Sequence, residues 1–222
     1  MVREDIALYD RVHAGHLLAR KLVMHQHSQS MIVALAHGGA VVGFEIAQAL
    51  ALSFDVLPCR KIKHPGNSSQ IIGSVSIEDV LIYEDILHIP QDYIYHQIML
   101  ARIGIEREYN FYYANQPRPS FTGKTVIVVD DVLEESAAVL ACVRSIRKHK
   151  PAQLVVAVPL VKPEVLEHLT KEADDIVFLR CEAGADSLRT LYTELPTIKE
   201  DEVRALLVRA KTPQTKSLYS LL

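Results

Sequence analysis

The stretch Val126-Ile127-Val128-Val129-Asp130-Asp131 decides the fold of this chain. Four β-branched residues in a row, with Thr125 before them, predict a short strand at residues 125–129 that is buried on both faces, as strands inside a parallel sheet are. Two carboxylates stand where this strand should end, and open parallel sheets bind ligands beyond the carboxyl ends of their strands. Asp130 and Asp131 could therefore receive sugar hydroxyls or help to hold a hydrated Mg²⁺. They could equally be solvated acids at the start of the next helix.

The segments on either side of this stretch alternate between strand and helix patterns. Short apolar runs predict further buried strands at residues 31–36, 54–60, 154–160 and 176–179. Apolar residues at helical spacing predict helices at residues 10–24, after the Gly38-Gly39 turn, at 90–113, after Asp131, at 163–171 and at 199–211. This alternation predicts a single α/β domain with a central parallel sheet flanked by helices.

The middle of the chain has a different character. Residues 63–69 are polar and contain Pro65, Gly66 and Asn67, which predicts a loop. Residues 71–83 alternate loosely, as one or two short strands would, and the helix after them is long. We therefore expect the core at about 28–62 and 122–182, an insertion that forms a helical hood at about 63–121, and a less regular tail at 183–222.

The composition is that of an ordinary soluble globular protein, with 49% hydrophobic and 23% charged residues. The net charge of −3 argues against a nucleic-acid binder, because affinity for a phosphate backbone needs a cationic face. Charges near the N-terminus argue against a signal peptide, and the most apolar region, residues 31–52, is too interrupted to span a membrane. Cys59, Cys142 and Cys181 lack the spacing of a zinc site or a disulfide framework, so we expect a cytoplasmic protein. The sequence is compatible with a homo-oligomer.

Other interpretations of these motifs are weaker. A response-regulator receiver domain also begins with a strand and acids, but it needs another acid just after a later strand, and Asp174-Asp175 precede theirs. Gly38-Gly39 and Gly43 do not give the GxGxxG spacing of a dinucleotide site. Four histidines could suggest a metal, but without a carboxylate or cysteine to complete a site they are more often ordinary histidines. They are His13, His16, His25 and His27.

In this context the strand and its acid pair resemble the diphosphoribosyl-binding signature of type I phosphoribosyltransferases. The chain is most similar to a bacterial subgroup known only as predicted phosphoribosyltransferases. Further segments agree with that subgroup in order and separation, so the resemblance covers residues from about 9 to 160. They are Tyr9-Asp10-Arg11 with Ala14-Gly15, Gly38-Gly39 with Val42-Gly43, Arg60-Lys61 with Pro65-Gly66-Asn67, and the long helix that ends near Tyr113.

The resemblance implies an enzyme that binds 5-phosphoribosyl 1-pyrophosphate with Mg²⁺ and transfers the phosphoribosyl group to a nitrogenous base. In such enzymes the acid pair, here Asp130 and Asp131, holds the ribose hydroxyls and helps indirectly to hold Mg²⁺. The Gly-Gly turn, here His37-Gly38-Gly39, receives pyrophosphate, and the loop at residues 134–138 cradles the 5′-phosphate. Arg60-Lys61, beside a turn-rich loop, is a candidate anion contact or, equally, a solvated pair.

The loop that should cradle the phosphate departs from the family pattern. Where the family has Thr-Gly-Ala-Thr or something close, this chain has Glu135-Ser136-Ala137-Ala138, preceded by Glu134. A phosphate loop needs small residues, free backbone N–H groups and hydroxyls at a helix N-terminus. Here two carboxylates stand near the expected place of a dianion, and like charges at about 4–5 Å repel by a few kcal/mol even at an effective dielectric near 20.

Two further departures lie outside this loop. His37 stands where the family usually has Arg, and only Tyr192 remains of an aromatic pair in the tail, with Ala185 and Arg189 at other altered positions. Two classes of function therefore stay open. The protein is either a phosphoribosyltransferase with an unusual phosphate loop or a non-catalytic nucleotide-binding, nucleoside-binding or regulatory module on the same fold. In both cases we expect a small-molecule partner: phosphoribosyl pyrophosphate, a nucleotide or a nucleoside.

Overall fold

The larger sheet of the molecule is parallel, and β6 lies in its middle. The computed structural model describes residues 7–35, 37–83, 88–114, 119–184 and 187–211. The strands of this sheet are β1 (Met31–Leu35), β2 (Ser53–Leu57), β6 (Thr125–Val129), β7 (Val132–Leu133), β8 (Gln153–Val161) and β9 (Asp175–Cys181). Their order is β2-β1-β6-β8-β7, β9 also pairs with β8, and each pairing is parallel. This confirms the central parallel sheet that the sequence predicts.

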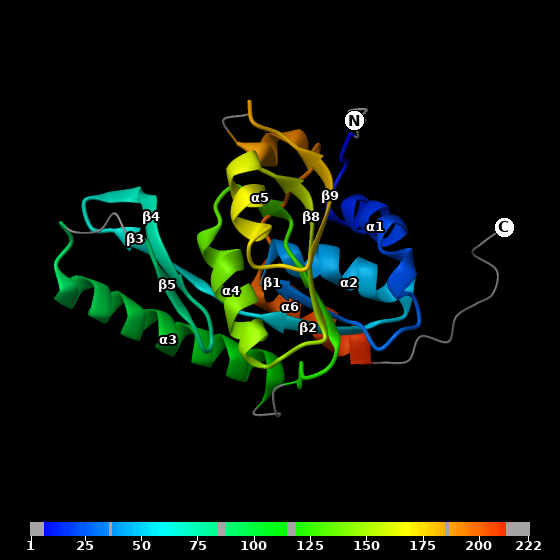
Figure 1. Cartoon of the computed structure of the whole chain (residues 1–222), viewed down its shortest axis with the longest axis horizontal. Coiled ribbons are helices and arrows are strands. Elements are labelled where there is room, and N and C mark those ends of the chain that lie inside the picture. Colours follow the sequence, from blue (N-terminus) through cyan, green and yellow to red (C-terminus); the bar gives the residue numbers. More distant parts are fainter. Residues whose placement is uncertain (1–6, 36, 84–87, 115–118, 185–186, 212–222) are drawn as a thin grey trace.

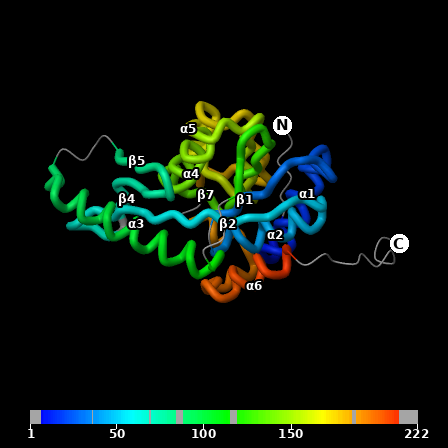
Figure 2. The backbone as a smooth tube through the Cα atoms, turned by 90° about the horizontal axis from the view of Figure 1, so that it is seen from below, coloured from blue at the N-terminus to red at the C-terminus, as the bar shows by residue number. Residues whose placement is uncertain are grey.

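Helices cover both faces of this sheet (Figure 1). The helices of the described residues are α1 (Arg11–Lys21), α2 (Gly38–Leu50), α3 (Gln91–Tyr113), α4 (Ala137–Lys148), α5 (Pro163–Leu169) and α6 (Glu200–Lys211), with short 3-10 turns η1 (Val23–His25) and η2 (Leu188–Leu191). One apolar cluster joins the sheet to α1 and α2, and another joins its opposite face to α4 and α5. α6 lies below the sheet, against α2 and the C-terminal end of α3 (Figure 2).

The residues of β6 show why the sequence specifies this strand so strongly. Ile127 and Val129 belong to the cluster on the α1–α2 face, whereas Val126 and Val128 belong to the cluster on the α4–α5 face. Successive side chains of a strand point to opposite faces, so a strand covered on both sides needs an unbroken apolar run. The predicted bounds of this strand are confirmed to the residue.

A smaller antiparallel sheet stands beside the larger one. Its strands are β3 (Arg60–His64), β4 (Asn67–Val75) and β5 (Val80–Ile82). α3 packs across it through an apolar cluster that includes Ile62, Ile72 and Ile105. We call this sheet together with α3 the hood; it forms the left side of the molecule in Figure 1. The division of the chain into core, insertion and tail stays a prediction.

The hood corrects the loop that the sequence predicts at residues 63–69. Only the turn between His64 and Asn67 is a loop, because β3 continues to His64 and β4 begins at Asn67. This end of the hairpin is largely exposed, so its polar side chains can stay in water while the backbone pairs.

Three smaller boundaries also differ from the expectation. The strand expected to reach Arg60 ends at Leu57, because Pro58 has no N–H for a sheet ladder. The first helix ends at Lys21 and is followed by η1, and Pro90 caps α3 instead of lying in its first turn. In the described part of the chain, no helix has the length and apolar character to cross a bilayer.

Candidate functional site

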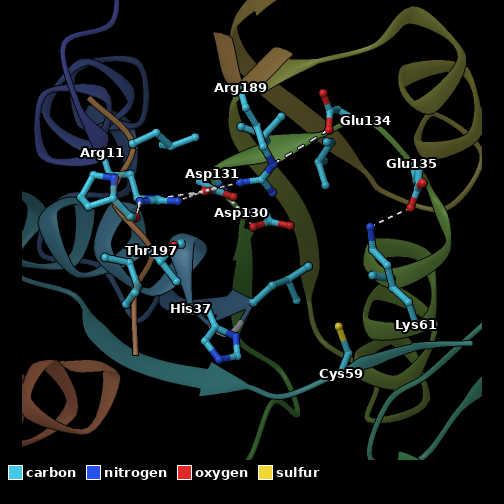
Figure 3. Close-up of a pocket in the computed structure, with 18 residues that line it drawn as sticks. Arg11, His37, Cys59, Lys61, Asp130, Asp131, Glu134, Glu135, Arg189 and Thr197 are labelled. Atoms are coloured by element: carbon cyan, nitrogen blue, oxygen red, sulfur yellow. Dashed lines mark hydrogen bonds and ion pairs between the residues drawn. The ribbon is translucent and has the colours of Figure 1, made fainter. Parts of the chain in front are cut away.

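A cavity of about 380 Å³ opens at the carboxyl ends of β1 and β6 (Figure 3). The predicted site residues that line it are His37, Gly38, Lys61, Asp130, Asp131, Glu134, Glu135 and Ala138. Arg11, Cys59, Arg189 and the tail segment 195–198 contribute to the same wall. Segments that are far apart in the sequence therefore meet at the edge of the sheet where the strand pattern places the acids.

The carboxylate of Asp131 is held by a buried cation. Nε and Nη2 of Arg11 lie 2.8 and 2.7 Å from Oδ2 of Asp131, and both side chains are buried. Nη1 of Arg11 also donates to the carbonyl oxygen of Pro196 at 2.6 Å. A buried charge is tolerated only when it is paired and hydrogen-bonded. Arg11 therefore fixes Asp131 and ties the tail to the same point.

The two glycines of the predicted pyrophosphate turn have a steric reason to be there. A Cβ on Gly38 would collide with Oδ2 of Asp131 and lie 2.8 Å from Nε of Arg11. A Cβ on Gly39 would lie 2.9 Å from the carbonyl oxygen of Val129. Because real Cβ atoms do not approach this closely, the first turn of α2 can pack on the end of β6 only without side chains.

His37 adopts a strained backbone at the start of α2. Its φ is 67° and its ψ is −112°, a combination that costs a residue with a side chain about 1–3 kcal/mol. His37 lines the cavity and also a second, open depression of about 540 Å³, where Arg107, Phe111 and Lys199 are neighbours. The strained residue thus lies between two hollows that a single ligand could reach.

Asp130 is the more available acid of the pair. Its Oδ1 accepts a hydrogen bond of 2.8 Å from the backbone N–H of Asp131. Burial, together with the negative charge of Asp131, raises the pKa of Asp130 well above its ordinary value. The oxygens of a carboxyl group at this place can form hydrogen bonds with ribose hydroxyls.

The acid pair is a poor resident site for Mg²⁺. Mg²⁺ usually takes one or two carboxylates together with substrate phosphates and water. Here Arg11 neutralises Asp131, and Asp130 resists ionisation. Within the described residues, no group of three or more His, Cys, Asp or Glu side chains could hold a metal ion. The described residues therefore offer no complete protein site for Mg²⁺, and the indirect role of Asp130 and Asp131 that the family resemblance implies would need oxygens of a bound ligand.

Both glutamates of the altered loop line the cavity and are engaged by donors from other segments (Figure 3). Oε1 of Glu134 accepts from the Ser187 hydroxyl at 2.7 Å and from the Leu188 N–H at 2.6 Å, and its Oε2 lies 4.0 Å from Arg189. Oε2 of Glu135 accepts from Nζ of Lys61 at 2.7 Å. The donors that could have met a phosphate are thus already bonded to carboxylates of the protein.

The other residues of the loop form a buried helix start. Ser136, Ala137 and Ala138 are all buried. The Ser136 hydroxyl lies 3.1 Å from Nδ1 of His168 and 3.4 Å from the Tyr83 hydroxyl. Among the described residues, Ser136 and Ala137 do not belong to the cavity wall, whereas Ala138 does. The hydroxyl that survives in the loop is therefore directed at other parts of the protein.

The two neighbouring cations of the hood, Arg60 and Lys61, lie in different surroundings. Arg60 forms an ion pair with the buried carboxylate of Glu108 in α3, so it joins the strands of the hood to their helix. Lys61, the next residue, points to the other side of the strand and lines the cavity. The structure therefore brings Lys61 into the candidate site and leaves Arg60 outside its wall.

Arg11 and Arg189 are cavity residues that the sequence did not single out. Arg11 could have been noticed, because it falls on the same helical stripe as Ala14 and Leu18, where a charge is unusual. Arg189 gave no such signal; its Nη1 lies 3.7 Å from Oδ2 of Asp131. Ala185, the other altered tail position, lies outside the described residues.

Comparison with known proteins agrees with this geometry. A family model described as "Phosphoribosyl transferase domain" matches residues 8–182. Relatives from Mycobacterium tuberculosis strains CDC 1551 and H37Rv, named "Putative phosphoribosyl transferase" MT0597 and Rv0571c, are each 26% identical over 205 residues. These residues are 90% of this chain and 46% of each relative, so the chain spans about half the length of the curated relatives it matches.

A solved structure extends the likeness to the fold. The crystal structure of TT1426 from Thermus thermophilus superposes with a TM-score of 0.77 at 27% sequence identity, over 92% of this chain and 99% of that one. The family match spans well over half of the chain, and it includes the Gly38-Gly39 turn and the acid pair Asp130-Asp131. The chain belongs to the phosphoribosyl transferase domain family.

Proposed function

We propose that this protein binds a ribose-bearing small molecule without a 5′-phosphate, such as a nucleoside, and does not transfer phosphoribosyl groups from phosphoribosyl pyrophosphate. One observation carries the proposal. Glu134 and Glu135 stand at the phosphate loop and take up the Ser187 and Lys61 donors themselves. A phosphate that entered here would have to displace carboxylates, which would then remain beside a dianion.

The remainder of the cavity suits the sugar part of such a ligand. Asp130 offers carboxyl oxygens in the cavity wall that can meet sugar hydroxyls, and a volume of about 380 Å³ lies within the usual range for small-molecule sites. A longer ligand could extend past His37 into the neighbouring depression, where Phe111 offers an aromatic ring. Because Mg²⁺ accompanies phosphates in this family, binding should not depend on Mg²⁺.

Isothermal titration calorimetry tests this proposal directly. The protein is titrated with adenosine, guanosine, cytidine and uridine, with their 5′-monophosphates, and with phosphoribosyl pyrophosphate plus Mg²⁺. We expect at least one nucleoside to bind at least tenfold more tightly than its monophosphate, and Asp130→Asn to abolish that binding. Saturable, Mg²⁺-dependent binding of phosphoribosyl pyrophosphate in the low micromolar range would overturn the proposal.

A working phosphoribosyltransferase is the second candidate. It is favoured by the family membership and by two cavity cations, Lys61 and Arg189, which are about half exposed and could turn toward a ligand. Release of pyrophosphate on mixing with phosphoribosyl pyrophosphate, Mg²⁺ and a panel of bases would support it. The same assay on Asp130→Asn separates this activity from that of a contaminant.

We also propose that the protein forms a homodimer through the outer face of α3. Tyr95, Met99, Leu100 and Ile103 form an exposed apolar stripe there, and such a patch can mark an interaction surface. Two antiparallel copies of α3 centred near Met99 would set Asp92 of one against Arg107 of the other. Light scattering should report a dimer that Met99→Glu with Ile103→Glu converts to a monomer; a monomeric wild type would contradict it.

The three free cysteines support a reducing compartment such as the cytosol.

A further inference from the structure

Two cysteines from different parts of the fold lie next to each other beside the cavity. Cys59 is in the connection from β2 to β3 and lines the cavity, whereas Cys142 is in α4 and is fully buried. The two side chains are close enough to interact, and this interaction lowers the pKa of Cys59 and raises that of Cys142. Cys59 also packs against the apolar cluster that contains Cys142.

The strand register of the hood supports this placement independently. Arg60 of β3 pairs with Val75 of β4, so Cys59 runs alongside Ser76. The hydroxyl of Ser76 donates to the carbonyl oxygen of Ala141 at 3.3 Å, one residue before Cys142. The hood is thus fastened to α4 at the level of the two thiols.

The geometry points to a reversible disulfide between Cys59 and Cys142, a redox modification site that is reached through the ligand cavity. Cys59 is the partner that meets solvent, because it stands in the cavity wall near Lys61 (Figure 3). Cys142 is enclosed and can react only with a group that is already beside it. A peroxide small enough to enter the cavity is the oxidant.

The chemistry balances in two steps. The Cys59 thiolate attacks one oxygen of hydrogen peroxide, so an S–O bond forms, the O–O bond breaks and hydroxide leaves, which takes up a proton to become water. The Cys142 thiol then attacks the sulfenic sulfur of Cys59, so an S–S bond forms, the S–O bond breaks and the second water leaves with the Cys142 proton. Two thiols lose two electrons in total, and one peroxide gains them.

The two thiols are suited to these different roles. The interaction with Cys142 and the nearby Lys61 and Arg60 lower the pKa of Cys59, which favours the attacking thiolate. The interaction with Cys59 and burial raise the pKa of Cys142, which keeps it as a protonated resolving thiol. Cys181 provides an internal comparison, because burial and the neighbouring Glu164 and Glu182 raise the pKa of its thiol.

Peptide mapping by mass spectrometry tests this inference without any ligand. The protein is exposed to a small excess of hydrogen peroxide, free thiols are blocked, and cross-linked peptides are identified with and without dithiothreitol. We expect a Cys59–Cys142 cross-link that dithiothreitol removes, and the same result in Cys181→Ser. Cys142→Ala, which keeps the buried position apolar, should stop at a dimedone-reactive sulfenic acid on Cys59.

The result that would overturn the inference is equally specific. It is a wild-type protein in which Cys59 accumulates as a dimedone adduct without the cross-link, or in which Cys181 reacts faster than Cys59. Cys59→Ser is a second control, because it should leave Cys142 unmodified under the same conditions. The readout is a covalent bond, so its outcome is distinguishable from the outcome of the ligand titrations.

Discussion

At one end of the cavity Arg11 and Asp131 form a buried ion pair, whereas at the other end Lys61 and Glu135 form an ion pair that is open to solvent. The buried pair is locked by its surroundings, since α2 approaches it so closely that Gly38 has no room for a Cβ. The exposed pair has water as an alternative partner. The Lys61–Glu135 pair can therefore change at little cost in stability, whereas a change in the Arg11–Asp131 pair should destabilise the fold.

Replacement of the buried cation Arg11 should cause the largest loss of stability among the variants that test this comparison. Arg11→Met leaves the Asp131 carboxylate buried without its main partner, which costs about 3–5 kcal/mol of unfolding free energy. Urea denaturation followed by circular dichroism measures this loss. Arg189→Met is the matched control, because Arg189 is half exposed and 3.7 Å from the same oxygen, and it should cost less than about 1 kcal/mol. Equal losses in the two variants would contradict the contrast.

Asp55 sharpens the comparison as a buried acid whose hydrogen-bond partner is a tyrosine, Tyr113. Burial raises the pKa of Asp55 from 3.8 to about 6, against the opposing effect of that hydrogen bond. As pH rises, the unfolded chain therefore loses this proton first, and stability falls between about pH 4 and pH 6. The loss amounts to about 3 kcal/mol for a shift of roughly two units.

The variant Asp55→Asn isolates this pH dependence. Its stability relative to the wild type should improve by about 2–3 kcal/mol between pH 4 and pH 7, as measured by urea denaturation at each pH. Asp174→Asn is the control of opposite sign, because the hydrogen bond from Arg147 lowers the pKa of Asp174. A flat difference between the wild type and Asp55→Asn would show that Asp55 titrates normally.

Rebuilding the phosphate loop tests whether the departure is local. The variant combines Glu134→Ala, Glu135→Thr, Ser136→Gly and Ala138→Thr, which removes two charges and returns two hydroxyls at the start of α4. Charge-assisted hydrogen bonds to phosphate contribute about 1.5–3 kcal/mol each, so affinity for phosphoribosyl pyrophosphate should rise at least tenfold by calorimetry.

The same variant with Asp130→Asn is its control and should lose the affinity that was gained. An unchanged circular dichroism spectrum shows that the variant folds, which matters because Glu134 also holds the tail through Ser187 and Leu188. A folded variant without increased affinity would mean that the loop is not the sole cause of weak binding, and that His37 and the tail should be tested next.

The smallest effect on stability is expected at the exposed ion pair between Lys61 and Glu135. Glu135→Gln removes the ion pair with Lys61, whose side chains are 38% and 47% exposed, and should change the unfolding free energy by less than about 1 kcal/mol. The change should disappear in 0.5 M salt, where charges are screened within a few ångströms. A loss of unfolding free energy above 2 kcal/mol that persists in salt would mean that the Lys61–Glu135 pair contributes to stability as the buried Arg11–Asp131 pair does.

The sequence predicts the features of this fold that leave a local pattern, and it does not predict the pairings between distant residues. β6 was predicted to the residue because its burial on both faces leaves a local apolar pattern, and Asp130 was placed because parallel strands end at one edge. The partner of Asp131 is 120 positions away, and that of Glu135 is 74 positions away, so neither pairing leaves a local pattern. The hairpin at residues 63–69 was missed because exposed strands need no apolar alternation.

The two contacts of the Arg11 guanidinium, with Asp131 and with Pro196, also affect the order in which the protein folds. It joins Arg11 to Asp131 and to Pro196, across 120 and 185 positions, so the cavity wall has contacts of very long sequence separation. Contacts of this kind form late in folding, since the entropy of closing a long loop must be lost first. A nascent chain still on the ribosome, with Pro196 yet to emerge, can form α1 and β6 but not this wall. The cavity wall is thus complete only once the chain has folded as far as Pro196.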